Sequence, residues 1–438
     1  MRPILSFLLA VLTSVSTASA AAIDGCPLFP ADSIWNTAID SAPVDAASST
    51  YVMTMGATTQ IHADFGTVYN GAPNGIPYTT VPGTQPLVPI TFQYAGDSDP
   101  GPYPIPSNAP IEGGPNANGD RHILIVDRDR CLLYEIYAAR AQSDGSWRAG
   151  SGAKWDLRSN ALRQATWTSA DAAGLPILPG LVRYDEVMSG EINHALRFTV
   201  PQTRNTFIWP ARHQASSLSG AQYPPMGLRF RLKAGYDISR FPPTMQVVLR
   251  ALKKYGMIVA DNGSAWYLSG APDPRWSDDD LRTLSQLVGN DFEAVNVNGL
   301  QVSANSGQAL QAAPPLLTAP ADADYDIDGD GRYDALTDGL LVLRYLFGLR
   351  GATLASGAIS GGATRTVAGV ETRMSQLGAA LDVDGDGRLN ALTDGILIIR
   401  KLFGITGPRL IDGAIAPGAT RNSAQAVIDY IESFTPQR

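Results

Sequence analysis

The sequence has 438 residues, of which 44% are hydrophobic and 17% are charged, and its formal net charge is −8 at pH 7. This length predicts two or three domains, and this composition is typical of globular, loop-rich proteins and excludes a largely disordered chain. Binding to nucleic acid needs clustered Lys and Arg side chains that neutralise phosphates. Because the chain is acidic and has no such cluster, we expect no nucleic-acid partner.

The first residues have the pattern of a secretory signal peptide. Arg2 precedes an apolar run over residues 4–12, and Ala-Ser-Ala at 18–20 offers a cleavage site. We therefore expect residues 1–20 to be removed and the protein to be secreted and extracellular. The apolar run is too short to span a bilayer, and no later stretch approaches the roughly 20 apolar residues of a transmembrane helix.

The two cysteines of the chain are Cys26 and Cys131. Paired thiols persist as disulfides outside the cytoplasm. Secretion therefore predicts a disulfide that ties the start of the mature chain to the middle of the first domain.

Residues 22–297 are predicted to form a first domain that is rich in β-strands. Apolar residues alternate in GLRFRLKA from Gly227 and in NHALRFTV from Asn193, which is the strand period, while HILIVD and CLLYEIY read as a hairpin. Helical signals come late: an apolar stripe runs from Met245 to Tyr255 before Gly256, and Ser277 can cap a helix that begins with acidic residues. We expect a mainly β or α+β domain resembling a β-sandwich, or alternatively a long twisted sheet with helical decoration.

Residues 298–323 are predicted to be a linker, because Ala, Pro, Ser and Gln replace the periodic pattern there. An internal repeat follows over residues 324–438. The segment DIDGDGRYDALTDGLLVLRYLFG from Asp326 recurs as DVDGDGRLNALTDGILIIRKLFG from Asp382, and GAISGGATR from Gly357 recurs as GAIAPGATR from Gly413. Such duplication indicates two copies of one structural unit, which we expect to be small and all-α.

Each repeat begins with a calcium-loop pattern. Calcium takes six to eight oxygen ligands, and an acidic residue at every second position of a tight loop brings three carboxylates to one point. Glycine at the sixth position permits the sharp turn, the seventh residue offers its carbonyl oxygen, and the ninth binds often through water. The expected ligands are Asp326, Asp328, Asp330, Arg332, Asp334 and Asp338 in the first repeat, and Asp382, Asp384, Asp386, Arg388, Asn390 and Asp394 in the second.

These loops, each followed by an apolar helix, resemble dockerin type I repeats, which are EF-hand-like. Both copies depart from that pattern, because the closing acidic residue stands at the thirteenth loop position and threonine occupies the twelfth. The resemblance implies two bound Ca2+ ions, a cohesin-bearing scaffold or cell-surface protein as partner, and an enzyme that degrades polysaccharide. We expect the helical stripes to form the module's core: Leu336, Leu340, Leu343 and Phe347 in one copy, and Leu392, Ile396, Ile399 and Phe403 in the other.

The first domain lacks a motif with a readable mechanism. It resembles a group of secreted bacterial proteins with segments like GDRHILIVD, WTSADAAGLPILPGLVRYDE and NHALRF. This resemblance implies no particular reaction. Glycoside hydrolysis needs two flanking carboxyl groups, and a lyase needs a His or Tyr base. The chosen catalytic candidates are Asp64, Glu112, Glu135, His122 and His194, and the wider set adds Asp185, Glu186, His62 and His213.

Five tryptophans are candidates for sugar-stacking platforms or for core residues: Trp147, Trp155, Trp167, Trp209 and Trp266. The sequence thus favours a secreted polysaccharide hydrolase with a calcium-binding, dockerin-like module. A non-catalytic carbohydrate-binding or surface protein and a polysaccharide lyase remain as alternatives.

Overall fold

The computed structural model describes residues 21–310 and 324–435, so the expected signal peptide and residues 311–323 of the expected linker lie outside the described part. The chain divides into two compact units at Gln311 and Ala312. Residues 298–310, which composition assigns to the linker, belong to the first unit. They are tied to it by bridges between Ser33 and Gln308 and between Ala161 and Ser306.

The first unit contains a mixed six-stranded sheet in the order β17-β14-β15-β13-β16-β3. Its strands are β17 (Phe292–Val295), β14 (Arg229–Leu232), β15 (Met257–Asn262), β13 (Leu196–Val200), β16 (Tyr267–Ser269) and β3 (His62–Asp64). Four helices accompany it: α1 (Ser48–Gly56), α2 (Tyr184–Ser189), α3 (Pro243–Lys254) and α4 (Asp278–Arg282). The stripe that predicted α3 is buried, and Ser277 caps α4 by accepting from the backbone N–H of Asp280.

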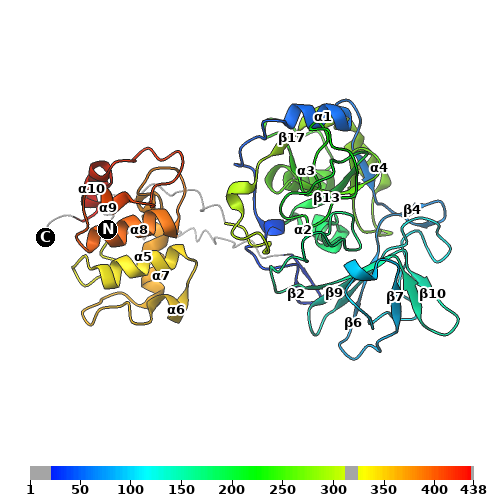
Figure 1. Ribbon diagram of the computed structural model, residues 1–438, viewed down its shortest axis with the longest axis horizontal. Coiled ribbons are helices and arrows are strands. Elements are labelled where there is room, and N and C mark those ends of the chain that lie inside the picture. The colour runs from blue at the N-terminus through cyan, green and yellow to red at the C-terminus, as the bar shows by residue number, and fades with distance from the viewer. Residues whose placement is uncertain (1–20, 311–323, 436–438) are drawn as a thin grey trace, which may run out of the picture. The chain divides into compact units, whose positions relative to one another are not determined.

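A four-stranded sheet has the order β12-β9-β8-β6, and a three-stranded sheet has the order β10-β11-β7. The strands are β12 (Ser151–Asp156), β9 (Leu132–Tyr137), β8 (Ile123–Asp127), β6 (Tyr78–Val81), β10 (Arg140–Ala141), β11 (Trp147–Ala149) and β7 (Ile90–Phe92). In Figure 1 these strands gather on the side of the unit away from α1 and α3. Two short hairpins complete the unit: β1 (Ala22–Ile23) with β2 (Cys26–Pro27), and β4 (Val68–Tyr69) with β5 (Ala72–Pro73).

The hairpin β8–β9 is the centre of the four-stranded sheet and is buried on both faces. Ile123 and Ile125 pack into a core shared with the three-stranded sheet, whereas Leu124 and Val126 pack into the main core. This explains why the segment reads as a continuous apolar run instead of alternating. A disulfide joins Cys26 of β2 to Cys131 in the hairpin turn, as predicted. The mixed α+β class is confirmed, while the sandwich arrangement stays a prediction.

The regular elements of residues 324–435 are all helical. They are α5 (Leu340–Leu346), α6 (Gly351–Ala355), α7 (Val367–Leu377), α8 (Ile396–Leu402), α9 (Pro408–Ile411) and α10 (Ala424–Ser433), with a 3-10 turn η8 (Gly378–Leu381). Single π-helical turns, η7 (Ala335–Gly339) and η9 (Ala391–Gly395), precede α5 and α8.

The two repeats pack against each other through glycines. A side chain at Gly339 would meet Ile399 at 3.2 Å, and one at Gly395 would meet Leu343 at 2.9 Å. Each glycine directly follows the closing aspartate of its own loop. The helix of one repeat therefore lies against the loop end of the other.

The expected core stripe of the second unit is partly wrong. Leu341 and Val342 of α5 and the matching Leu397 and Ile398 of α8 are fully buried. Four stripe residues are instead more than half exposed: Leu336, Phe347, Leu392 and Phe403. The run from Leu340 to Leu343 is apolar on every side of the helix, so the sequence leaves its buried face ambiguous.

Candidate functional site

In each repeat of the second unit three buried aspartates converge. The groups are Asp326, Asp328 and Asp338 in the first repeat, and Asp382, Asp384 and Asp394 in the second; within each group the carboxylate oxygens lie within 4.8 Å of one another. Three carboxylates held this closely repel one another unless a cation or protons neutralise them. The donor set is hard oxygen with a high negative charge, which fits a calcium ion.

Backbone amides fix the carboxylates of the first loop. Asp326 accepts from the N–H groups of Gly329 at 2.9 Å and Gly331 at 3.0 Å. Gly331 has a φ of +85°, which permits the sharp turn that its position predicted. In the second loop, the carboxylate of Asp382 accepts from the N–H groups of Gly385 and Gly387 in the same way.

The extra residue of each loop is taken up by a π-helical turn. A π-turn holds one residue more than an α-turn. Through η7 the carboxylate of Asp338 returns to the loop, where it accepts from the N–H groups of Ile327 at 2.6 Å and Asp334 at 2.8 Å. Asp394 makes the equivalent bonds to Val383 and Asn390 through η9. The thirteenth position thus supplies the closing carboxylate.

Deleting Leu336 tests this interpretation, because its side chain is 65% exposed and it lies within the π-turn. The deletion should convert the π-turn into an α-turn and leave Asp338 beside Asp326 and Asp328. We expect calcium titration calorimetry to retain two sites. Deletion of Leu343 from α5, which shifts the core instead, is the control that should destabilise the unit. Loss of one site in the Leu336 deletion would contradict the π-turn explanation.

The other predicted ligands lie farther from these groups. Asp330 and Asp386 are not part of them, and each carboxylate accepts from the backbone N–H two residues on. Asp334 is exposed, and the side chain of Asn390 accepts from Leu392. Arg332 and Arg388, whose backbone carbonyls were the predicted ligands, are exposed residues.

A second segment of each repeat reaches back to its loop. Ser360 donates its N–H to Asp328 at 2.8 Å, Thr364 donates its hydroxyl to the carbonyl of Gly329 at 2.7 Å, and Arg365 donates to the carbonyl of Asp326. Thr420 and Arg421 do the same in the second repeat. These contacts explain why GAISGGATR recurs with the loops. They also bring a guanidinium beside each acidic group, which the sequence did not suggest.

Two of the five chosen catalytic candidates in the first unit are buried structural groups. Glu135 is fully buried, and its carboxylate accepts from the N–H groups of Ile177 and Leu178 and from the indole of Trp155. His194 is also fully buried and contacts the carbonyl of Ala195 and the carboxylate of Glu186. Neither has surface for a substrate, so both assignments are corrected.

The remaining three candidates, Asp64, Glu112 and His122, belong to one polar cluster. His122 contacts Glu112 at 2.6 Å through Nδ1 and the carbonyl of Ala170 at 3.0 Å through Nε2. Asp64 ends the edge strand β3 and pairs in register with Ser269 of β16. Three of the five predicted residues therefore lie in one polar cluster, although they come from separate segments.

Arg197 of β13 is the centre of this cluster, which we call the Arg197 cluster: Asp64, Glu112, His122, Asp171, Arg197, Asp261 and Ser269. Arg197 donates to both carboxylate oxygens of Asp171, at 2.9 and 3.1 Å, and to the hydroxyl of Ser269 at 2.7 Å. Its Nη2 also lies 4.0 Å from Asp261. His122, Asp171 and Arg197 come from the three segments of the resemblance to secreted bacterial proteins.

The environment of the cluster shifts the pKa values of its carboxyl groups in opposite directions. Burial and, less strongly, Asp171 raise the pKa of Asp261 to about 7. Loss of hydration among the neighbouring groups raises the pKa of Asp64, although its residue surface is exposed. For Glu112 burial opposes ionisation, but the ion pair with His122 outweighs it and lowers the pKa. The same pair overcomes the burial of His122 and raises its pKa to about 9.

The His122–Glu112 pair should make the first unit's stability pH-dependent. Folding raises the pKa of His122 from 6.5 to about 9, so the stabilisation is complete below pH 6.5 and is lost as the pH rises to about 9. We expect urea unfolding, followed by tryptophan fluorescence, to lose on the order of 3 kcal/mol across this window. His122→Gln and Glu112→Gln should both flatten this dependence. A wild-type slope retained in both variants would contradict the prediction.

The wider candidates have ordinary partners. His62 is exposed and stacks on Tyr267, with ring centroids 4.2 Å apart. His213 contacts the carbonyl of Ala172. Asp185 pairs with Arg275 at the surface, and Glu186 pairs with Arg183 and His194.

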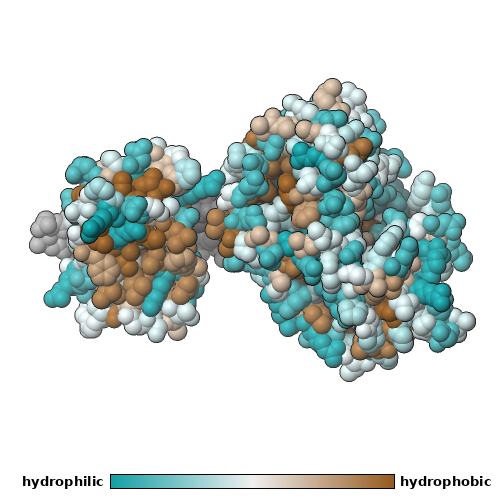
Figure 2. Space-filling view, in the orientation of Figure 1, coloured by the Kyte–Doolittle hydropathy of each residue, from teal (hydrophilic) through white to brown (hydrophobic). Residues whose placement is uncertain are grey.

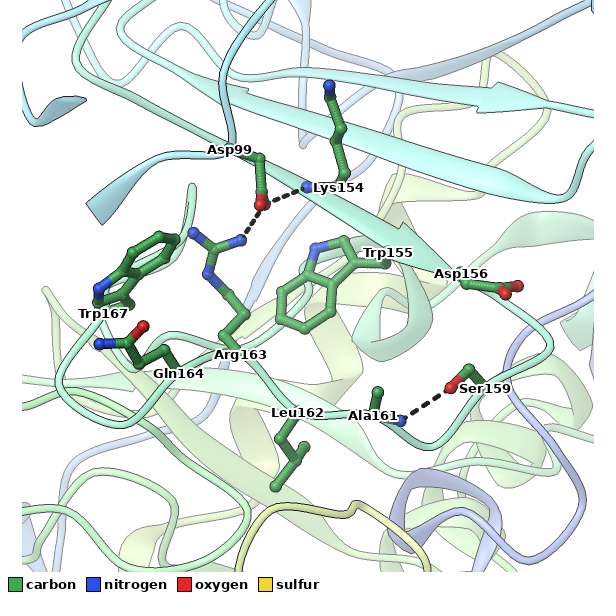
Figure 3. Close-up of a pocket in the computed structure, with 10 residues that line it drawn as sticks. All are labelled: Asp99, Lys154, Trp155, Asp156, Ser159, Ala161, Leu162, Arg163, Gln164 and Trp167. Atoms are coloured by element: carbon green, nitrogen blue, oxygen red, sulfur yellow. Dashed lines mark hydrogen bonds and ion pairs between the residues drawn. The ribbon is translucent and has the colours of Figure 1, made fainter. Parts of the chain in front are cut away.

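Trp155 and Trp167 line a cavity of about 210 Å³. Figure 3 shows the guanidinium of Arg163 between the two indoles, 5.6 and 5.5 Å from their rings, and paired with Asp99. Because Arg163 occupies the inner ring faces, these faces are closed to sugar stacking. Four of the five proposed platform tryptophans are buried core residues: Trp147, Trp155, Trp209 and Trp266.

No family model matches the chain, and no curated protein or solved structure matches it either. Within residues 21–310 and 324–435 there is no helix with the length and apolar character needed to cross a membrane.

Proposed function

We propose that this chain is a secreted, carbohydrate-active protein that hydrolyses O-glycosyl bonds in polysaccharide and carries a dockerin-like module that binds two Ca2+ ions. The observation that carries the proposal is the pair of three-aspartate groups in the second unit. Each group combines carboxylates, a glycine turn and a closing acidic residue in the order that the dockerin resemblance implies.

The surface of the second unit supports a docking role. Among residues 324–435, the large apolar residues that are more than half exposed are Leu336 and Phe347 in the first repeat and the equivalent Leu392 and Phe403 in the second. Figure 2 shows apolar surface gathered over the region of α5 and α8. Exposed apolar side chains repeated in both copies favour a protein partner. The occupant implied by the resemblance is a cohesin module of a scaffold or cell-surface protein.

Catalysis is assigned to the first unit, because the Arg197 cluster combines carboxyl groups with separated pKa values at a surface. Such separation is what acid–base chemistry on a glycosidic bond requires.

Release of reducing sugar from a panel of xylan, arabinan, β-glucan, chitin and pectin tests the enzyme proposal. We expect one of these polysaccharides to be cut. The lyase alternative predicts a product that absorbs near 232 nm. The binding alternative predicts retention on a polysaccharide affinity gel without cleavage. A protein that neither cuts nor is retained would overturn the carbohydrate assignment altogether.

A further inference from the structure

Three carboxyl groups of the Arg197 cluster reach solvent. Asp64 is exposed, and the side chains of Glu112 and Asp261 are each 26% exposed. Beneath them Asp171 is fully buried, and Arg197 is 4% exposed. The cluster therefore has a buried ion pair as its floor and three carboxyl groups at its surface.

We propose that Asp261 and Glu112 are the acid and base of the first unit's catalytic site, and that Arg197 and Asp171 are positioning residues beneath them. This inference rests on the proposed hydrolysis of glycosidic bonds and specifies where it takes place. The sequence did not single out Asp261, Asp171 or Arg197.

The backbone turns Asp261 toward the cluster through an irregularity in the sheet. Phe198 of β13 pairs with Val259 of β15, but the next residue, Thr199, pairs with Asp261. Ala260 is therefore an extra residue on β15. Such a bulge re-aims the side chain that follows it, and bulges are common beside active sites.

Asp261 is not the main partner of the guanidinium. Asp171 takes both of its forked N–H groups, whereas Asp261 stands 4.0 Å away, beyond hydrogen-bond distance. Asp261 can therefore carry a proton without breaking the Arg197–Asp171 pair.

Glu112 has the opposite environment. Its Oε2 accepts from His122 at 2.6 Å, and His122 is in turn fixed by the carbonyl of Ala170. Ala170 directly precedes Asp171, so one segment contacts both the partner of Glu112 and the buried Arg197–Asp171 ion pair.

The charges around both groups favour these roles. Asp171, Arg197 and His122 act on Asp261, and burial with Asp171 keeps it protonated up to about pH 7. His122 and Arg197 keep Glu112 ionised. Asp64, His62, Asp120 and Tyr137 are further titratable groups around this site. A protonated acid together with an ionised carboxylate in one site is the arrangement that glycosidases use.

The proposed reaction is a hydrolysis in which atoms and charges balance. Asp261 gives its proton to the glycosidic oxygen as the bond from the anomeric carbon to that oxygen breaks. Water attacks the anomeric carbon and passes a proton to Glu112. Proton exchange with solvent then restores both carboxyl groups.

The test uses full-length protein on the polysaccharide of the panel that the wild type cuts. Asp261→Asn and Glu112→Gln should each lower kcat/KM at least about 100-fold. The wild-type rate should fall above about pH 7, with the pKa of Asp261, and this alkaline decline should be absent in Asp261→Asn. Glu293→Gln is the matched control, because Glu293 pairs with Arg231 in the same sheet at 19% exposure, and it should stay within about twofold of wild type.

The outcomes separate the inference from the proposed function. If the wild type cuts none of the polysaccharides, both are overturned. If it cuts one and Asp261→Asn or Glu112→Gln keeps the wild-type rate, the assignment alone is wrong. It is also wrong if Asp64→Asn, not Asp261→Asn, removes the alkaline decline. Should Asp261→Asn not fold, Asp261→Glu replaces it, with a rate at least about tenfold lower and the decline retained.

Discussion

Chelation of calcium is expected to unfold the second unit while the first unit stays folded. Without a cation each group of three aspartates is left with like charges within 4.8 Å. For a site with a dissociation constant near 1 µM, about 1 mM calcium adds about 4 kcal/mol of stability. All seven tryptophans lie in the first unit, so their fluorescence should be unchanged by EDTA. Calorimetry in EDTA and in calcium should show a shift in one transition only.

Single substitutions separate the two sites. Asp338→Asn and Asp394→Asn should each reduce the calcium stoichiometry from two to one, because each removes the closing carboxylate of one group. Asp429→Asn is the control, since Asp429 is exposed and pairs only locally with Gln425. Identical melting of the wild type in EDTA and in calcium would contradict metal binding in both loops.

Removing the disulfide is expected to destabilise the first unit by about 4 to 5 kcal/mol. The bond joins Cys26 to Cys131, which are 105 positions apart, so its loss frees a long loop in the unfolded chain. The double variant Cys26→Ser and Cys131→Ser avoids an unpaired thiol. Urea unfolding followed by tryptophan fluorescence measures the change.

The calcium-dependent transition of the second unit is the internal control for that variant, because the disulfide lies wholly in the first unit. It should not move. A loss of less than about 1 kcal/mol in the first unit would show that the unfolded chain gains little freedom when the bond is absent.

The convergence of acidic residues in each loop was partly predictable, because neighbouring positions of one loop supply two of the three carboxylates. Asp326 and Asp328 stand two residues apart, and the turn glycine follows within the same loop, so one short segment supplies both carboxylates. The same spacing also includes Asp330, which is not part of the group. The role of Arg365 was not predictable in this way, since it reaches the carbonyl of Asp326 from 39 residues downstream. The recurrence of its segment was the one available signal.

The structure shows which catalytic candidates are fully buried and which reach the surface, and the sequence alone does not give this information. Glu135 lies in a strand buried on both faces, and His194 lies under α2, so their surroundings come from distant segments. Asp261 was missed because it is the second-last residue of an apolar strand and belongs to no motif. Its position depends on a one-residue mismatch between β13 and β15, which only the paired strands reveal.

The glycine contacts between the repeats link the two aspartate-rich loops. Gly339 follows Asp338 and packs on Ile399, while Gly395 follows Asp394 and packs on Leu343. An ion that orders one loop end therefore also orders the surface on which the opposite helix rests. Loading of the second ion should then require less ordering than loading of the first, so the binding isotherm should be positively cooperative.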